Sequence, residues 1–127
     1  MSHLSTIKTK LRKKPPLIQA LLAMDLSVDI NQQMNNPQGH NHEKIWCDVT
    51  VGDDIGFRWN KQTQSYELVT DLQTWSREVP PKRFIDKVSQ QYAIELLSAT
   101  AKSEGFEVEK KEVNTEGAVE LTVTRWT

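Results

Sequence analysis

The sequence predicts an α+β fold in which two helices pack on one face of a mainly antiparallel sheet. Apolar residues alternate with a period of two over several short segments. Two longer segments begin at a Pro-Pro pair and continue with apolar residues at helical spacing, and turn compositions separate the segments. The expected order is strand, helix, four strands, helix and two strands.

The N-terminal part of the chain predicts a strand and then a helix. Residues 4–10 (LSTIKTK) contain Thr and Ile, which favour strands. Pro15 and Pro16 then begin a helix, because proline is tolerated in the first turn, where its missing N–H costs nothing. A broad apolar side follows, made of Leu17, Ile18, Leu21, Leu22 and Ala23.

The centre of the chain predicts consecutive strands. Residues 27–33 are a weak strand, and residues 34–42 (MNNPQGHNH) are a loop because Asn, Pro and Gly follow one another closely. Residues 45–51 alternate strictly. Their two faces carry Ile45, Cys47, Val49 and Val51, and Trp46, Asp48 and Thr50, respectively. We therefore expect Cys47 in the core and Trp46 on the second face of the sheet.

Residues 56–69 (GFRWNKQTQSYELV) predict a β-hairpin. With KQTQ as a four-residue loop, Trp59 lies opposite Tyr66 and Arg58 lies opposite Glu67. An aromatic pair and an opposite-charge pair across two strands each contribute about 0.2–1 kcal/mol to a sheet. Trp59 and Tyr66 have the parity of their apolar neighbours and are expected on the core face, whereas Arg58 and Glu67 point to the second face.

The next segment predicts a turn and a long helix. Residues 71–78 (DLQTWSRE) form a turn or a single helical turn that carries Trp75. Pro80 and Pro81 then begin a helix that continues to about Glu104. Its buried stripe is expected at Ile85, Val88, Tyr92, Leu96 and Ala99.

The last two strands complete a repeated order of elements. Residues 106–113 and 118–126 predict strands joined by an Asn-Thr-Glu-Gly turn. The order strand–helix–strand–strand then occurs twice, which indicates a tandem duplication at the level of topology. A chain of 127 residues is large enough for one core and too small for two ordinary domains, so residues 1–127 form a single domain.

The charge distribution is uneven although the formal net charge is −1. Before Asp25 the chain has no acidic residue, and we call its basic residues the basic N-terminal segment: Lys8, Lys10, Arg12, Lys13 and Lys14. A pI of about 6.3 argues against a dedicated nucleic-acid module. No apolar run could span a bilayer, and a single cysteine allows no intramolecular disulfide, which fits a reducing compartment.

Three segments resemble one family in the right order. They are MSHLSTIKTKL, GFRWN with YELVTDLQTW, and KRFIDKVSQQYA. Together they resemble the "hypothetical chloroplast reading frame thirty-five" family of cyanobacteria and red-algal plastids, a domain of unknown function, over nearly the whole chain. The resemblance implies a protein of a photosynthetic organism, in the cytoplasm or the plastid stroma. It carries no catalytic residues across, and it implies an AAA-type ATPase as a candidate protein partner.

Residues that could ligate a metal or catalyse a reaction are few and scattered. His40, His42 and Cys47 have zinc-ligating groups, but their spacing fits no standard zinc finger. The acids show no paired arrangement: Asp48, Asp53, Asp54, Asp71 and Asp86. The chain has no GxSxG, Walker or GxGxxG motif. We therefore expect no metal and no cofactor, and favour a protein that is not an enzyme.

The sequence favours a non-enzymatic accessory or assembly protein that binds a protein partner. The partner would contact Trp46, Arg58 and Glu67 on the second face of the sheet. It would also contact Trp75, because a loop tryptophan is either tucked under or used for contact. The alternative is an RNA- or DNA-binding protein that uses the basic N-terminal segment, since clustered Lys and Arg bind phosphates by releasing counterions. A plainer interpretation of that segment is a solvated edge protected by lysines.

Overall fold

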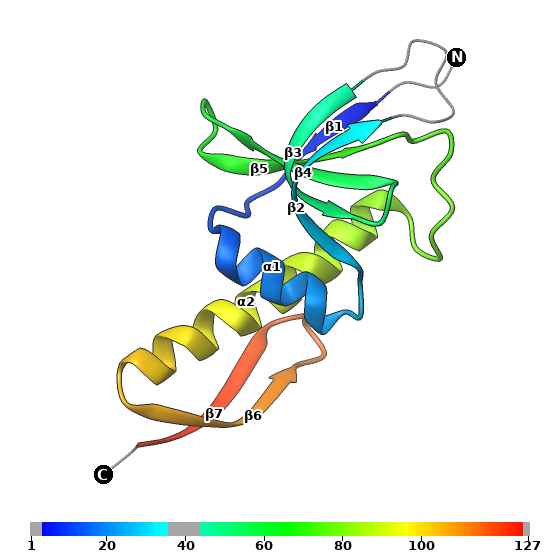
Figure 1. The fold of residues 1–127 in the computed structure, drawn as a ribbon. Coiled ribbons are helices and arrows are strands. Elements are labelled where there is room, and N and C mark those ends of the chain that lie inside the picture. Colours follow the sequence, from blue (N-terminus) through cyan, green and yellow to red (C-terminus); the bar gives the residue numbers. More distant parts are fainter. Residues whose placement is uncertain (1–3, 36–43, 126–127) are drawn as a thin grey trace.

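The structure is a computed structural model that describes residues 4–35 and 44–125 (Figure 1). Its elements follow the predicted order: β1 (Ser5–Lys8), α1 (Lys14–Ala23), β2 (Val28–Asn35), β3 (Lys44–Val51), β4 (Ile55–Asn60), β5 (Ser65–Thr70), α2 (Pro81–Ser103), β6 (Phe106–Val113) and β7 (Val119–Arg125). The predicted α+β fold is confirmed. Trp126, the last residue of the predicted final strand, lies outside the described residues. Among the described residues, neither helix combines the length and the apolarity needed to cross a membrane.

The main sheet has five strands in the order β1-β5-β4-β3-β2, and all neighbours are antiparallel. The N-terminal strand reaches the far edge, where Ile7 lies opposite Leu68 of β5. The chain after β1 stays attached to this edge, since the Tyr66 N–H donates to the Leu11 carbonyl. The predicted hairpin forms with the predicted pairs, and Trp59 lies opposite Tyr66.

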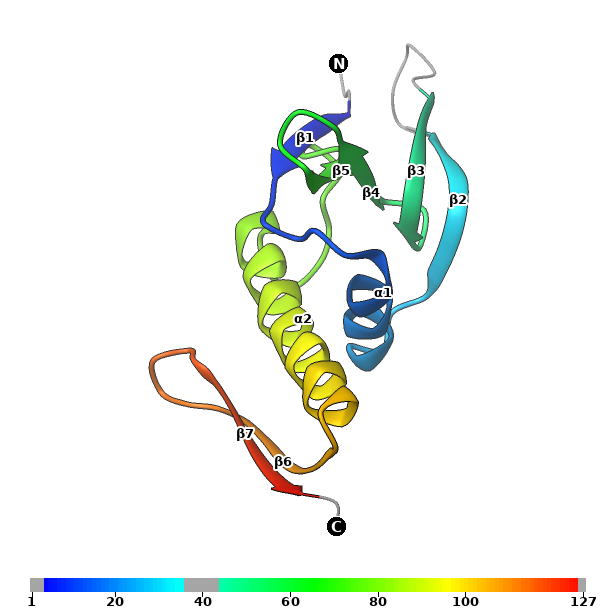
Figure 2. The same ribbon diagram turned by 90° about the vertical axis from the view of Figure 1, so that its left-hand side faces the viewer.

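Both helices lie on one side of this sheet, which we call the core face (Figure 2). α1 contributes Leu17 and Leu21, and α2 contributes Phe84 and Val88. The strands contribute Val49, Val51, Ile55, Phe57, Tyr66 and Leu68. None of these side chains is more than 6% exposed. Because burial of each large apolar side chain contributes about 1.5–3 kcal/mol, this cluster is the main source of stability.

The C-terminal half of α2 leaves the sheet and carries a hairpin of its own. With 23 residues the helix is about 35 Å long, so it runs past the sheet. β6 and β7 therefore pair with each other alongside α2, at the end of the molecule away from the main sheet (Figures 1 and 2). The two predicted repeats thus share an order of elements but not a pairing, because β2 and β3 join the main sheet whereas β6 and β7 do not.

The position of this hairpin changes which side of α2 is buried. Val88 is fully buried, as predicted, but Ala99 is exposed. Ile94 and Ser98 are buried instead, on the half of the helix that β6 and β7 contact. The predicted apolar stripe is therefore correct where α2 covers the sheet and wrong at Ala99, where the sheet has ended.

Strand β3 changes face in its middle, which the strict alternation of its sequence does not predict. Val49 lies in the core, but Cys47 packs with Met34 and Val69 on the opposite face. β3 pairs with β4 only from Val49 onward. Beyond this point the Asp48 carboxylate, rather than a backbone carbonyl, accepts the Trp59 N–H at 2.9 Å. The first half of β3 therefore separates from β4, and its side chain at Cys47 lies on the face of the sheet opposite Val49.

Gly56 leaves the space in which β3 can cross this face of the sheet, because it has no side chain. Its neighbours Ile55 and Phe57 face the core, so a side chain at position 56 would point to the opposite face. A Cβ at this position would collide with the Cys47 Sγ. The predicted burial of Cys47 is correct, but its predicted place on the core face is wrong.

Candidate functional site

The candidate site is the face of the main sheet opposite the helices, which we call the open face. Its charged row crosses three strands, with Lys8 of β1 opposite Glu67 of β5 and Glu67 opposite Arg58 of β4. Its apolar row holds Met34, Cys47 and Val69, each at most 4% exposed, with Leu4 and Ile45 packed around them. Among the described residues, both helices pack elsewhere.

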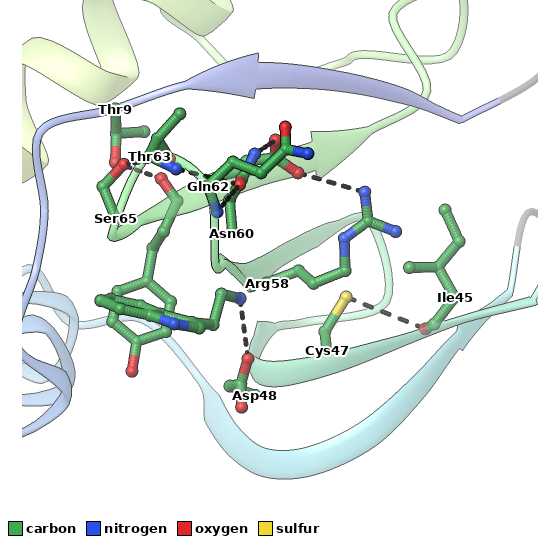
Figure 3. A network of polar contacts seen from close by, with 12 residues as sticks. Thr9, Ile45, Cys47, Asp48, Arg58, Asn60, Gln62, Thr63 and Ser65 are labelled. Carbon is green, nitrogen blue, oxygen red and sulfur yellow. Dashed lines mark hydrogen bonds and ion pairs between the residues drawn. The ribbon is translucent and has the colours of Figure 1, made fainter.

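Glu67 is the centre of the charged row. Arg58 Nη2 lies 3.1 Å from Glu67 Oε2, and Asn60 Nδ2 donates to Glu67 Oε1 at 2.5 Å. Figure 3 labels Arg58 and Asn60 in this network. The Asn60 hydrogen bond, and then the hydrogen bond and charge of Arg58, hold the pKa of the Glu67 carboxyl below its usual value, against burial, which raises it. Glu67 is therefore a fixed carboxylate that orients a partly exposed arginine.

Asn60 also builds the tip of the hairpin. Its Oδ1 accepts hydrogen bonds from the N–H groups of Gln62 and Thr63, at 2.8 and 3.2 Å. Its backbone carbonyl accepts from the Gln64 N–H. The Asn60 side chain thus links the hairpin loop to Glu67 in the charged row. The polar side chains of residues 56–69 therefore serve largely to stabilise the hairpin.

The apolar row contains a buried, neutral thiol. Burial raises the pKa of the Cys47 thiol to about 11, against the nearby Arg58 charge, which lowers it. A neutral thiol is a poor nucleophile and a poor metal ligand. Residues 4–35 and 44–125 contain no group of three His, Cys, Asp or Glu side chains placed to hold a metal ion. His40 and His42 lie outside the described residues.

A hollow of about 290 Å³ lies on the open face next to the apolar row. It lies over β2 and β3 and the turn that follows β3, and its lining includes Asp29, Gln32, Thr50 and Asp53. Thr50 lies opposite Gly56, which places the hollow on the open face. The open face therefore presents a basic end, a small apolar centre and an acidic hollow.

Trp46 does not lie beside Arg58, contrary to the parity prediction. Because Cys47 is on the open face, its neighbour Trp46 points to the other side of the β2–β3 ribbon, opposite Gln33. Its side chain is 57% exposed, the highest value among the large apolar side chains of the described part of the chain. Trp46 is therefore available to a partner at the edge of the sheet rather than on its open face.

Trp75 packs against the start of α2 and is not directed away from the fold. Its Nε1 donates to the Val79 carbonyl at 2.8 Å, and its ring packs edge-on against Phe84 with centroids 5.8 Å apart. Arg77 lies over the same Phe84 ring and forms two hydrogen bonds with Asp54, at 2.7 and 2.9 Å. These contacts fix the loop before α2 to the turn between β3 and β4, so they give Trp75 a packing role.

The basic N-terminal segment does not form one continuous patch. Lys8 is on the open face beside Glu67. The backbone N–H groups of Arg12 and Lys13 both donate hydrogen bonds to the Tyr92 hydroxyl of α2. Lys13 and Lys14 line a separate groove beside α2. Lys10 is exposed between these two positions. Nucleic-acid binding by this segment stays a prediction.

Several of the candidate catalytic acids have structural contacts. The Asp48 carboxylate accepts the Trp59 N–H, and Asp54 binds Arg77. Asp71 Oδ1 accepts the Gln73 N–H at 2.9 Å. Asp53 and Asp86 are exposed on different elements. These acids come from different parts of the chain, and the contacts of Asp48 and Asp54 hold backbone and side chains of the fold in place.

Sequence reasoning missed Met34, Asn60 and Gly56 as parts of this site. A glycine inside a strand is a known sign of close approach by another chain segment, so Gly56 could have indicated the crossing of β3. An asparagine at the end of a strand is typical of a hairpin loop, so Asn60 could have been found from its position. No local signal marks Met34, which belongs to a polar segment.

Comparisons with known proteins agree with the resemblance seen in the sequence. The family model described as "Protein of unknown function (DUF1257)" matches residues 20–122. A protein of Guillardia theta named "Uncharacterized protein ycf35" is 32% identical over 130 residues, covering 99% of this chain and 98% of its own. Proteins of the same name from Pyropia yezoensis and Cyanophora paradoxa are 32% and 30% identical, with the same coverage. No solved structure matches. The chain belongs to the DUF1257 family, whose plastid relatives are named ycf35.

Proposed function

We propose that this protein is a non-enzymatic accessory or assembly protein that binds a protein partner through the open face. The observation that carries the proposal is the one-sided cover of the main sheet, where the described helices pack on the core face alone. Arg58 stands on the other face, oriented by Glu67. Arginine is enriched at protein interfaces, and a side chain fixed in advance loses little entropy on binding.

The size of the open face indicates that a partner would also reach the sheet edge. Five strands about 4.8 Å apart and about 20 Å long give a face of about 500 Å². A standard interface buries about 800 Å² on each partner. The exposed Trp46 at the β2–β3 edge supplies the kind of aromatic anchor that interfaces use. A partner that covers the charged row and wraps over this edge would meet both features.

The family resemblance makes an AAA-type ATPase the first partner to test. The same resemblance favours the cytoplasm or the plastid stroma of a photosynthetic organism as the place of action. Both statements belong to the proposal, since the relatives are similar in sequence and their names specify no partner.

A charge swap across β4 and β5 tests the open face. Arg58→Glu combined with Glu67→Arg keeps an opposite-charge pair across β4 and β5 but reverses the charges presented to a partner. We expect affinity purification from the native host to lose its specific partner. The melting temperature should fall somewhat, because an arginine at position 67 cannot accept the Asn60 hydrogen bond and lies opposite Lys8, so circular dichroism is used to confirm that the variant is folded. The swap Lys82→Glu with Asp86→Lys, on the exposed side of α2, is the matched control. Recovery of the same partners in equal yield by both variants would reject the open face as the binding surface.

A further inference from the structure

A groove separate from the open face lies between the start of α1 and the C-terminal half of α2. It has a volume of about 740 Å³, within the range of about 300–1,000 Å³ typical of ligand sites. One residue of the hairpin, Lys111 of β6, also lines it. The helices lie on the core face of the sheet (Figure 2), whereas the strand register places the charged row on the open face, so this groove and the open face are independent surfaces.

The lining of the groove is strongly basic. Four lysines, which we call the rim lysines, come from the start of α1, the end of α2 and β6: Lys13, Lys14, Lys102 and Lys111. Glu95 is the one acid in its lining, and its Oε1 accepts a hydrogen bond from Gln91 Nε2 at 3.1 Å. In the part of the chain that the structure describes, the four lysines form no ion pair. Like charges around one groove repel one another, so an anionic occupant would be stabilised by all four.

The lining of the groove also has an apolar part, made of Pro15 and Pro16 of α1 and Leu96 and Ala99 of α2. Uncharged polar side chains complete the lining: Gln19, Ser98, Thr100 and Ser103. Leu96 and Ala99 continue the predicted apolar stripe of α2, and in the structure Leu96 is half-buried and Ala99 is exposed. The sequence therefore maintains an apolar stripe beyond the part of α2 that the fold covers.

The chemistry of the groove favours an acidic protein segment over a nucleic acid. Its lining contains no aromatic side chain and no arginine, the groups on which single-stranded nucleic acids stack. The prolines also remove N–H groups from the first turn of α1, so this helix start offers few backbone donors to a phosphate. A lining that combines lysines with apolar side chains matches a segment that alternates carboxylates with apolar side chains, as in the helix-in-groove mode of recognition.

We propose that this groove binds an acidic, amphipathic segment of a partner protein. The apolar side chains of the segment rest on Leu96, Ala99 and Pro16, and its carboxylates pair with the rim lysines. The inference goes beyond the open face, because it assigns a second surface and a partner chemistry to this protein. A protein with two such surfaces would hold two partners, or two parts of one, with one on the open face and one in the groove.

A defined peptide tests the groove. The probe is a fluorescent peptide made of Glu, Leu and Ala residues, titrated with the full chain in an anisotropy assay. We expect saturable binding that weakens as salt rises. The variant Lys13→Glu, Lys14→Glu and Lys102→Glu should weaken it at least about tenfold, because three favourable charges become unfavourable. The same peptide with Gln in place of Glu should also bind at least about tenfold more weakly.

Matched controls make the outcome decisive. The variant Lys82→Glu, Arg83→Glu and Lys87→Glu makes the same change in charge on α2 outside the groove and should leave the affinity nearly unchanged. Equal loss in both variants, or no binding of the acidic peptide by the unchanged protein, would overturn the proposal. Tighter binding of single-stranded oligouridine through the same groove lysines would overturn it in favour of a nucleic acid. The Arg58 and Glu67 charge swap should not affect the peptide, so failure of the groove and failure of the open face can be distinguished.

Discussion

The two faces of the main sheet are made from the same strands but are held in different ways. On the core face, large apolar side chains such as Phe57 and Leu68 are fully buried beneath two helices. On the open face, burial comes from the strands themselves, because β3 crosses over Gly56 and brings Cys47 against Val69. Polar contacts around Glu67 complete that face.

This difference separates stability from recognition. Apolar burial is the larger energetic effect, since a buried side chain contributes about 1.5–3 kcal/mol whereas a partly exposed ion pair contributes about 0.2–1 kcal/mol. The core face can therefore support the fold on its own, which leaves the charged row of the open face for the partner binding that we propose. Substitutions on the two faces should differ accordingly, first in stability and then in partner capture.

The largest effect is expected on the core face. Phe57→Ala removes a fully buried ring from beneath both helices and should lower the free energy of unfolding by about 3–5 kcal/mol. Val123→Ala on β7, where the side chain is 40% exposed, is the comparison and should change it by less than about 0.5 kcal/mol. Denaturant unfolding measures both. Similar losses for the two variants would mean that the hairpin is as tightly packed as the sheet.

A smaller loss is expected where β3 crosses the open face. Gly56→Ala places a Cβ against the Cys47 Sγ and should cost about 1–3 kcal/mol by overpacking. Cys47→Ala removes that sulfur, so the double variant should lose less than the sum of the single variants, by a coupling of about 0.5–3 kcal/mol. Additive losses would contradict a direct contact between these positions.

The crossing of β3 is a part of the fold that could not be predicted from the sequence. The alternation of residues 45–51 is regular, and a regular strand would place Cys47 and Val49 on the same face. The ladder to β4 ends at Val49, however, and Asp48 replaces the missing backbone acceptor for Trp59. That exchange depends on residues 11 positions apart in the chain, so no local pattern contains it.

Other parts of the site were accessible from sequence because they depend on local pairing. The hairpin register follows from loop length, so the Arg58–Glu67 and Trp59–Tyr66 pairs could be predicted and are confirmed. The two prolines at each helix start marked where α1 and α2 begin. The groove between the helices could not be found, because Lys14 and Lys102 are brought together only by the packing of α1 against α2.

A pH titration should reveal the polar contribution to the open face. The contacts of Glu67 lower the pKa of its carboxyl below the ordinary value of 4.5. A carboxyl with a lowered folded pKa stabilises the protein fully above its unfolded value, and this stabilisation is lost as pH falls through the folded pKa. Below a pH of about 4.5, the unchanged protein should therefore lose stability more steeply than Glu67→Gln.

Urea unfolding at a series of acidic pH values measures this difference. Glu78→Gln, an exposed carboxyl outside the charged row, is the control and should follow the unchanged protein. If Glu67→Gln and the unchanged protein instead gave parallel curves, the contacts from Asn60 and Arg58 would be too weak in solution to hold the carboxylate.

The smallest effect on stability is expected at Trp46, where the comparison moves from folding to binding. Its side chain is 57% exposed, so Trp46→Ala should change the free energy of unfolding by less than about 0.5 kcal/mol. Trp75→Ala should cost clearly more, because Trp75 packs against Phe84 and donates to the Val79 carbonyl. Partner capture should show the reverse order, with the greater loss at Trp46. Equal thermal destabilisation by the two variants would show that Trp46 is packed within the fold, and the sheet edge would then lose its place in the proposed interface.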